Sequence, residues 1–470
     1  MMELEFYGAA GHVTGSCHVL RIDGYTVLLD CGMIQGSDED QAHNEDAFPF
    51  DAAEVDAVVL SHAHIDHSGR LPLLVKRGFS GEIHAQNATR ALIEILLKDA
   101  AGIEMSWVRR ENRYRAEAHK PLLQPLYDVD DVDRALKLTR GHRYHESFEV
   151  VPGVTVQYYD AGHIMGSCVV EVTIEQNGER RTLVFSGDLG QYDSPILRDP
   201  ETPARADVVL METTYGDRRH RERAASLVEF GEVLQEAHRV GGNVLIPAFA
   251  VGRSQELLYQ LGKHYDEWGV KHWRIFLDSP LAIEASQIYW DFEHLFDKEA
   301  AEFFRGGETM PALPNLHFTR TKEESMVINR MKRGALVIAG SGMCNGGRIL
   351  HHFKRDIGHK QTHVVFTGYQ PPGTLGRRII EGAETIRIHG EHYAVRAHIH
   401  TIGGFSAHGD QEDLLRWYRG FETPPQTYLV HGDPDASAAF RRHLHNKLDV
   451  EAVVAKSKQR VDLLAPPPEA

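Results

Sequence analysis

Short hydrophobic runs alternate with amphipathic stretches along this chain, and the rhythm changes partway. Up to about residue 212, strand-sized runs such as Val55 to Ser61 and Val154 to Asp160 predict buried β-strands. Residues 87 to 119 predict one long helical stretch that ends in a polar, arginine-rich run. From about 213 to 385, runs such as 243–247 and 335–339 each precede a helical pattern, which predicts a parallel sheet flanked by helices. We therefore expect an α/β protein.

Length, charge and cysteine content restrict the class of protein. The chain has 470 residues, 42% of them hydrophobic and 25% charged, as expected for a globular protein of two or three domains. A formal charge of −16 argues against a protein coated in nucleic acid, but it allows a local cationic cleft. No apolar run approaches a membrane span, no secretory signal begins the chain, and four scattered cysteines argue against disulfides or a thiolate zinc site. We expect a cytoplasmic protein without membrane contact.

The strongest local motif is a cluster of histidines that follows the predicted strand Val55 to Ser61. His62 and His64 lie two residues apart in an extended segment, so their side chains point to the same side and can hold one metal ion. Asp66 and His67 lie where the chain turns into a helix, and there they can face a second ion. A histidine-rich surface loop is the alternative interpretation. Imidazole and carboxylate ligands without thiolates favour catalytic zinc.

Two ions need more ligands than this motif supplies, and the ends of other predicted strands offer them. Three residues each lie where a predicted strand ends in a glycine-bearing turn, namely His163, Asp188 and His431. Any one of them alone could have only a structural role. The combined set predicts two Zn²⁺, the first held by His62, His64 and His163, the second by Asp66, His67 and His431, with Asp188 bridging. Asp30 also ends a strand, and it either orients a ligand imidazole from outside or serves as a turn carboxylate.

These motifs resemble those of the metallo-β-lactamase superfamily and, within it, the β-CASP nucleases related to the mRNA 3′-end cleavage factor. The superfamily motifs occur in order as Asp30, His62-x-His64-x-Asp66-His67, His163 and Asp188. Three more residues resemble the three further β-CASP motifs. They are Glu212, His408 in Gly404-Phe-Ser-Ala-His, and His431 in Val430-His-Gly. A departure is His12, where relatives usually carry an acidic residue.

The resemblance implies both an architecture and an activity. It implies a metallo-β-lactamase αββα sandwich formed by residues 1–212 and 386–470, interrupted by a β-CASP domain at 213–385 that covers the active site. The implied reaction is hydrolysis of RNA by a two-metal-activated hydroxide, giving a 5′-phosphate and a 3′-hydroxyl, with Asp66 among the catalytic groups. His408 would be the general acid and Glu212 would hold its imidazole, although a hydrogen-bonded turn histidine is the alternative for His408.

Several aspects of RNA recognition also follow from the resemblance. The histidine at position 431 favours RNA over DNA, and the expected partner is single-stranded RNA. No KH-like extension precedes residue 1, so we expect RNA affinity to come from the two domains themselves. Endonuclease and 5′-exonuclease action both stay open, as do the RNA sequence preference, a homodimer and the role of His12.

Candidate phosphate-binding groups lie in glycine-rich turns, whose backbone N–H groups suit anions. They are Gly346 and Gly347 with the adjacent Arg348, Ser406 and Ala407 before His408, and Arg253. Such glycines also end helices, and such arginines often pair with surface carboxylates.

Two other functions compete with the ribonuclease. A small-molecule hydrolase of the thioesterase or lactonase type would share the two-zinc core, but it needs neither the large insertion nor Glu212 and His408. A catalytically silent RNA-binding scaffold would lose metal ligands, whereas all seven are present here.

Overall fold

The chain forms two compact units in the computed structural model, which describes residues 2–305, 313–371 and 373–465. The first unit comprises Met1–Ser194, Arg198–Arg219 and His408–Ala470, and the second comprises Pro195–Leu197 and His220–Ala407. The second unit extends past the predicted boundary at 385 because the strand His398–Thr401 adds to the edge of its sheet. Among the described residues, no helix is both long and apolar enough to cross a lipid bilayer.

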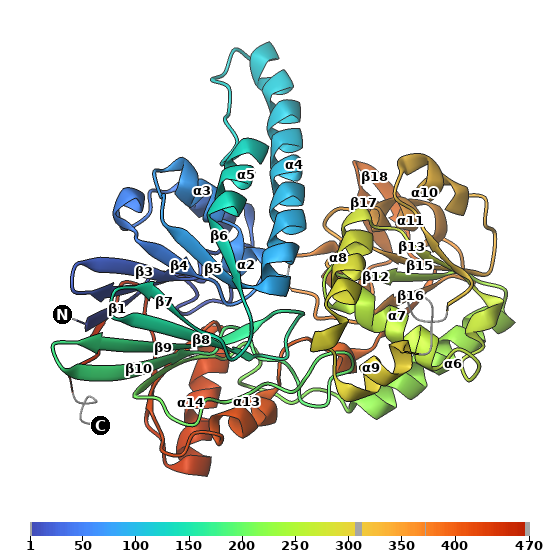
Figure 1. Ribbon diagram of the computed structural model, residues 1–470. Coiled ribbons are helices and arrows are strands. Elements are labelled where there is room, and N and C mark those ends of the chain that lie inside the picture. The colour runs from blue at the N-terminus through green and yellow to red at the C-terminus, as the bar shows by residue number, and fades with distance from the viewer. Residues whose placement is uncertain (1, 306–312, 372, 466–470) are drawn as a thin grey trace. The chain divides into compact units, whose positions relative to one another are not determined.

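Over the described residues the first unit contains two seven-stranded sheets (Figure 1). The first sheet has the order β22-β1-β2-β3-β4-β5-β6, with bounds β1 Met2–Phe6, β2 His18–Ile22, β3 Tyr25–Leu29, β4 Ala57–Val59, β5 Glu82–Gln86, β6 Thr139–His142 and β22 Arg460–Asp462. The second has the order β21-β20-β11-β10-β9-β8-β7, with bounds β7 Ser147–Val151, β8 Val154–Asp160, β9 Cys168–Gln176, β10 Glu179–Phe185, β11 Val208–Glu212, β20 Gln426–Val430 and β21 Ala452–Val454.

The two sheets face each other across one hydrophobic core. Alternating positions of each strand point inward, so Leu4 and Phe6 of β1 and Val156 and Tyr158 of β8 are buried in the same cluster. Burying a side chain of this size stabilises the fold by about 1.5–3 kcal/mol.

Several helices of this unit have the bounds α1 Asp38–Ala42, α2 Ile65–Ser68, α3 Leu71–Lys76, α4 Asn87–Glu117, α5 Val129–Leu138, α13 Gln411–Tyr418 and α14 Pro434–Leu448.

Helices cover the outer faces of this pair of sheets. Trp417 of α13 and Phe440 of α14 pack against Val184 and Val209, which point outward from the second sheet. α3, α4 and α5 contact the first sheet or one another on its other side. The predicted αββα sandwich is therefore confirmed.

The second unit contains a parallel sheet of six strands within the described ranges. Its order is β14-β13-β15-β12-β16-β19, with bounds β12 Val244–Pro247, β13 Arg274–Leu277, β14 Leu316–Phe318, β15 Ala335–Ala339, β16 His363–Phe366 and β19 His398–Thr401. A hairpin of β17 Thr385–Ile388 and β18 Glu391–Ala394 stands beside it. The helices have bounds α6 Arg223–Arg239, α7 Arg253–Lys263, α8 Pro280–Asp291, α9 Lys298–Phe304, α10 Lys322–Ile328, α11 Ile349–Asp356 and α12 Leu375–Ile380.

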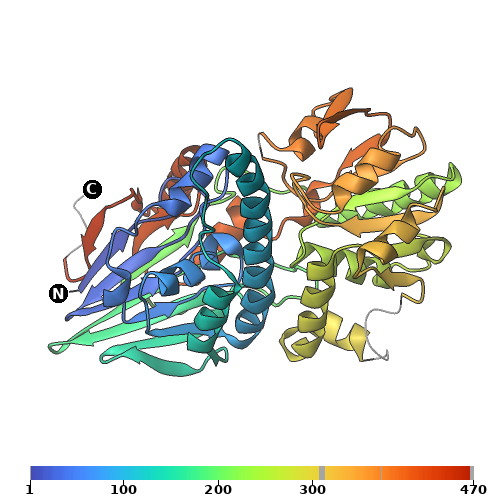
Figure 2. The same cartoon turned by 90° about the horizontal axis from the view of Figure 1, so that it is seen from above.

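Helices lie on both faces of this parallel sheet (Figure 2). Residues of α6, α7 and α8 share a core with one face, where Ile246 and Ile338 point, and residues of α10, α11 and α12 share a second core with Leu245 and Val337 on the opposite face. The predicted parallel sheet flanked by helices is confirmed, and its inner strands β12 and β15 are hydrophobic throughout because both faces are covered.

Candidate metal centre

The ends of several strands in the first unit supply the candidate site. They place Asp30 after β3, His62 and His64 after β4, His163 after β8, Asp188 after β10, Glu212 at the end of β11 and His431 after β20. β10, β11 and β20 run parallel, and β8 shares their direction because it and β10 both pair antiparallel with β9. Their carboxyl ends therefore lie at one edge of the second sheet, which brings together side chains that are far apart in the sequence.

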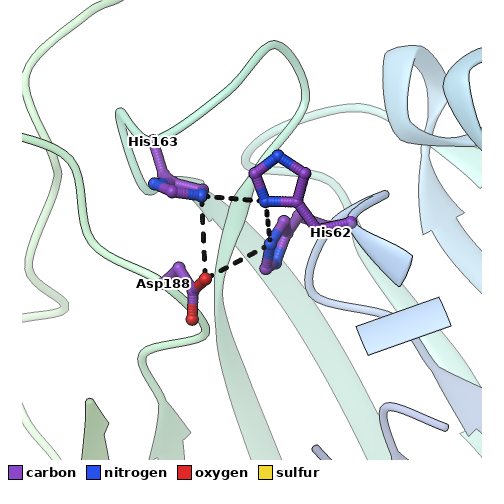
Figure 3. Close-up of side chains that lie close together, drawn as sticks. His62, His163 and Asp188 are labelled. Atoms are coloured by element: carbon purple, nitrogen blue, oxygen red, sulfur yellow. Dashed lines mark hydrogen bonds and ion pairs between the residues drawn. The ribbon is translucent and has the colours of Figure 1, made fainter. Parts of the chain in front are cut away.

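The first group of converging side chains consists of His62, His64, His163 and Asp188. His64 Nδ1 lies 3.1 Å from both His62 Nε2 and His163 Nε2. Asp188 Oδ2 lies 3.4 Å from His62 Nε2 and 3.6 Å from His163 Nε2. Figure 3 shows His62, His163 and Asp188 pointing toward one another. Three imidazole nitrogens and one carboxylate oxygen thus surround a single point.

The second group consists of Asp66, His67 and His431. His67 Nε2 lies 3.0 Å from His431 Nε2, and Asp66 Oδ2 lies 3.5 Å from the same His431 atom. Asp188 connects the two groups, because its other oxygen, Oδ1, lies 3.2 Å from His67 Nε2 and 3.5 Å from His431 Nδ1. One carboxylate therefore presents one oxygen to each group, which is the geometry of a bridging ligand.

Asp30 lies outside both groups and orients His67. Its Oδ2 lies 2.7 Å from His67 Nδ1, and its Oδ1 accepts a hydrogen bond of 2.7 Å from the backbone N–H of Ser61. The hydroxyls of Ser16 and Ser61 also donate to Asp30 Oδ2. A His67 tautomer that donates from Nδ1 leaves the Nε2 lone pair free for a metal. The carboxylate is fully buried and fits the orienting role.

The donor set fits zinc. Zn–N bonds of about 2.0–2.1 Å in a tetrahedron place neighbouring ligand atoms about 3.3 Å apart, close to the separations within both groups. Asp188 Oδ1 is buried and accepts no hydrogen bond from the described residues, although such an atom is costly to leave unsatisfied. A cation between the two groups would satisfy it. His62, His64 and His163 would hold one ion and Asp66, His67 and His431 the other.

The electrostatics differ between the two groups of side chains. Burial lowers the pKa of His62 well below its usual value and that of His64 to about 4, which keeps their lone pairs available. Burial also acts to lower the pKa of His67, but Asp188, Asp30 and Asp66 outweigh it and raise that pKa. Positive charge is therefore stabilised at the point where the second group converges.

A third group joins Asp188 to Glu212 and His408. His408 Nδ1 lies 3.2 Å from Glu212 Oε1, and His408 Nε2 lies 3.9 Å from Asp188 Oδ2. Glu212 is fully buried and also accepts hydrogen bonds from the backbone N–H groups of Leu189 and Thr214, at 2.7 and 3.1 Å. Burial acts to lower the pKa of His408, but the Glu212 carboxylate, Asp188 and Asp66 together raise it to about 9. These carboxylates favour the protonated form of the imidazole, and its Nε2 faces Asp188.

The predicted phosphate-binding residues belong to the second unit, and the proposed metal ligands belong to the first. Arg348 donates from its guanidinium to Asp278 at 2.7 Å and to the backbone oxygens of Thr319 and Arg320. These contacts commit much of the Arg348 side chain to the fold, because Asp278 is fully buried and needs charged partners.

The other phosphate candidates have structural contacts of their own. Arg253 is buried, forms an ion pair with Glu256 and lies over the Phe405 ring. Gly347 has a φ of +74°, and its turn approaches the backbone of Gly340 too closely for a Cβ atom. Ser406 and Ala407 directly precede His408. Phosphate binding by these residues stays a prediction.

Sequence reasoning missed two residues that support the site. The Ser61 hydroxyl contacts Asp30 and lies 3.1 Å from His62 Nδ1, so it helps to orient His62 directly and His67 through Asp30. The Thr214 hydroxyl lies 3.1 Å from His431 Nδ1. Both adjoin named motif residues, Ser61 just before His62 and Thr214 two residues after Glu212, and a hydroxyl at such a position is the signal that could have identified them.

Three family models match successive parts of the chain. The metallo-beta-lactamase superfamily model matches residues 10–230, the Beta-Casp domain model matches 254–379, and the model of the Zn-dependent metallo-hydrolase RNA specificity domain matches 392–455. The first and third of these segments lie mostly in the first unit, and the second lies within the second unit.

The chain is also similar to curated proteins over nearly its whole length. It is 41% identical to Ribonuclease TTHA0252 of Thermus thermophilus over 94% of this chain and 96% of that protein. It is 28% identical to Transcription termination factor FttA of Methanosarcina mazei over 97% of this chain and 71% of that protein. The identity to the RNase J-like protein of Methanocaldococcus jannaschii is 27%, over 97% and 98% of the two chains.

A solved structure from Enterococcus faecalis, described as a protein of unknown function, shares the fold. It superposes with a TM-score of 0.53 at 11% identity and covers 98% of this chain and 99% of its own.

Proposed function

This chain belongs to the β-CASP family of the metallo-β-lactamase superfamily, and we propose that it is a zinc-dependent ribonuclease that uses two zinc ions and a histidine general acid. The observation that supports two ions is the position of Asp188, whose two oxygens face two separate groups of ligands. The observation that supports RNA as substrate is the match to an RNA specificity domain together with the ribonuclease among the relatives.

The proposed chemistry divides between the metals and the chain. Zinc ions bound at the two groups would supply an activated water for attack on the phosphodiester and would neutralise charge on its non-bridging oxygens. His408 would donate its proton from Nε2 to the leaving ribose oxygen, because its Nδ1 faces the Glu212 carboxylate. Glu212 itself is fixed by two backbone N–H groups, so it holds the imidazole ring in one orientation.

The choice of His408 as proton donor rests on its different surroundings. The histidines of the first two groups are buried or half-buried and have ring nitrogens within about 3 Å of other ligand atoms. His408 keeps 21% of its side chain exposed and pairs through Nδ1 with a carboxylate that belongs to neither group. A partly exposed imidazole that pairs with Glu212 beside the ligands suits a proton donor better than a ligand. The cytoplasmic location and a homodimer stay predictions.

A comparison of substrates tests this function. The purified wild-type chain, supplied with zinc, should cleave an unstructured RNA and leave a generic thioester and a lactone unchanged. Asp188→Asn should abolish cleavage, because the amide removes the charge shared by the two groups, whereas Asp193→Asn changes an exposed carboxylate near it in sequence and should have no effect. Thioester hydrolysis without RNA cleavage would establish the small-molecule hydrolase instead. RNA binding without any hydrolysis would establish the scaffold.

A further inference from the structure

The second half of α4 is a surface feature that neither the fold nor the metal centre accounts for. α4 runs over 31 residues, Asn87–Glu117, and is buried repeatedly up to Ala101, but beyond that point Val108 is its one buried residue in the described chain. Figure 1 shows this half standing beyond α5 and the sheets of its unit, with the chain returning from its tip. We call residues 102–123 the arm. Core packing does not explain why the helix continues so far.

The arm is a defined structure rather than a frayed end. The Asn112 side chain accepts a hydrogen bond from the backbone N–H of Leu123 at 2.8 Å and donates to the carbonyl of the same residue at 3.0 Å. Arg115 donates to the carbonyl of Pro121 at 2.9 Å and lies 3.6 Å from Glu111. These contacts hold the returning segment against one face of the helix, so the opposite face has a fixed orientation.

That opposite face carries large apolar and aromatic side chains that are exposed. Ile103, Trp107 and Tyr114 follow the helical spacing i, i+4, i+11 and are 65%, 44% and 64% exposed. Leu122 on the returning segment is 59% exposed. Four of the eleven exposed large hydrophobic side chains in the described chain therefore lie within the arm. Scattered exposed residues need no explanation, but such a concentration indicates a binding surface.

Arginines lie among these aromatic residues. Four of the seven residues from 109 to 115 are arginine, in a chain with a net charge of −16. Arg110 belongs to the same helical stripe as Trp107 and Tyr114, at position i+7 from Ile103, and Arg109 and Arg113 are exposed beside it. Within the described chain, no hydrogen bond or ion pair engages the guanidinium groups of these three arginines.

We propose that the arm binds single-stranded RNA, with Trp107 and Tyr114 stacking on unpaired bases and Arg109, Arg110 and Arg113 contacting phosphates. Single-strand binding sites combine aromatic rings, which stack on any base, with cations that follow the backbone. From Ile103 to Tyr114 the stripe spans about 16 Å at the rise of an α-helix, enough for more than one nucleotide. This inference rests on the proposed ribonuclease function, and it gives that function a site of RNA contact outside the metal centre.

A second copy of this chain fits the arm less well. A two-fold symmetric contact through the stripe would bring the arginines of both copies close together with too few carboxylates to pair with them. Glu117 is exposed near this face, but its single negative charge faces the three positive charges of the arginines. RNA phosphates complement the arginines, whereas a second arm repels them.

The test compares two triple variants with equal changes in net charge. Arg109→Glu/Arg110→Glu/Arg113→Glu alters the arm, and Arg419→Glu/Arg441→Glu/Arg442→Glu alters exposed arginines of the same unit, one directly after α13 and two in α14. Binding of a labelled 30-nucleotide single-stranded phosphorothioate RNA, whose backbone keeps its charge and resists cleavage, is followed by fluorescence anisotropy. The arm variant should bind this RNA at least about tenfold more weakly than wild type. The slope of log affinity against log salt concentration should become smaller by about 2, at roughly 0.7 for each of the three lost phosphate contacts. The control should differ far less from wild type.

Three further measurements separate the possible outcomes. Trp107→Ala/Tyr114→Ala should weaken binding about 25-fold or more, because each of the two lost stacks contributes about fivefold or more. Cleavage of a tetranucleotide should be the same in the arm variants and wild type, since so short a substrate need not reach the arm, whereas KM for the long RNA should rise. Equal losses in the arm and control variants would overturn the proposal. So would unchanged RNA binding together with loss of a dimer in light scattering, which would assign the stripe to a second copy.

Failure of this inference is distinct from failure of the ribonuclease. If wild-type protein cleaves neither RNA, the proposed activity fails, while the anisotropy measurement still decides whether the arm binds RNA. If wild type cleaves both RNAs and the arm variants match it on both, the activity stands and the arm proposal fails. Circular dichroism checks that α4 is retained, as expected because Glu and Arg have similar helix propensities.

Discussion

Replacing His408 with alanine separates the proposed proton donor from the metal ligands. His408 pairs with Glu212 at 3.2 Å and approaches Asp188 Oδ2 no closer than 3.9 Å, so its removal leaves all seven proposed ligands in place. Glu212 keeps its hydrogen bonds from the backbone of Leu189 and Thr214, so the stability cost should be only about 1 kcal/mol. We therefore expect normal zinc content in a folded His408→Ala protein.

The expected loss of turnover for this variant is about 10²–10⁴-fold, the range for removal of a general acid, which corresponds to about 3–5 kcal/mol of transition-state stabilisation. Glu212→Gln should show a smaller loss, because the amide still contacts the ring while no longer carrying the charge that keeps it protonated. The assay is single-turnover cleavage of an end-labelled RNA, with zinc measured on the same samples.

A matched control for His408 exists in the same unit. His443 also pairs with a carboxylate, its Nε2 lying 3.1 Å from Glu412, but no proposed ligand group includes it. His443→Ala should therefore keep full activity. If His408→Ala loses zinc, His408 is a ligand and the assignment is wrong. If it keeps both zinc and full activity, another group protonates the leaving oxygen.

Three further predictions concern residues around the site. Asp30→Ala should weaken zinc binding about 10–100-fold in a chelator competition, because His67 loses the carboxylate that fixes its tautomer. Arg348→Ala should destabilise the protein by about 3–5 kcal/mol in urea unfolding, because it leaves buried Asp278 without its guanidinium, while a role in RNA binding alone would leave stability unchanged. Burial raises the pKa of Asp160 to about 7, so between about pH 4 and pH 7 the folded protein keeps a proton on Asp160 that the unfolded chain has lost. The free energy of unfolding therefore falls as the pH rises through this range. Asp160→Asn should remove that slope and be more stable than wild type at pH 8 by on the order of 3 kcal/mol, and equal slopes in urea unfolding would contradict it.

Much of the fold could be predicted from the sequence because its signals are local. β8 runs over Val154–Asp160 and β15 over Ala335–Ala339, as the hydrophobic runs predicted. The strand predicted at Val55 to Ser61 is shorter, with ladder pairing at Ala57–Val59. The arginine-rich end of the long helix was visible in the sequence, but its exposure and its distance from the core depend on tertiary packing.

The candidate site, like the fold, could be predicted from the sequence only in part. The motif from His62 to His67 has its own spacing signal, and the structure brings it together with distant residues such as His163 and His431. The split of Asp188 between two groups and the contact of Thr214 with His431 depend on the register of neighbouring strands, which no single segment reveals. For Arg348 and Arg253 the sequence did not identify their partners in the fold, the buried Asp278 and the partly buried Glu256.

The most direct test of a two-zinc ribonuclease is a titration of metal-free protein with zinc, following cleavage of a single-stranded RNA at each addition. When the protein concentration is well above the zinc dissociation constants, nearly all added zinc binds, so the curve reports activity against the number of bound ions. The arrangement of ligands around Asp188 predicts that cleavage rises until about two zinc ions are bound per chain and then stays constant. Full cleavage at one bound zinc per chain, or none at any zinc content, would contradict it.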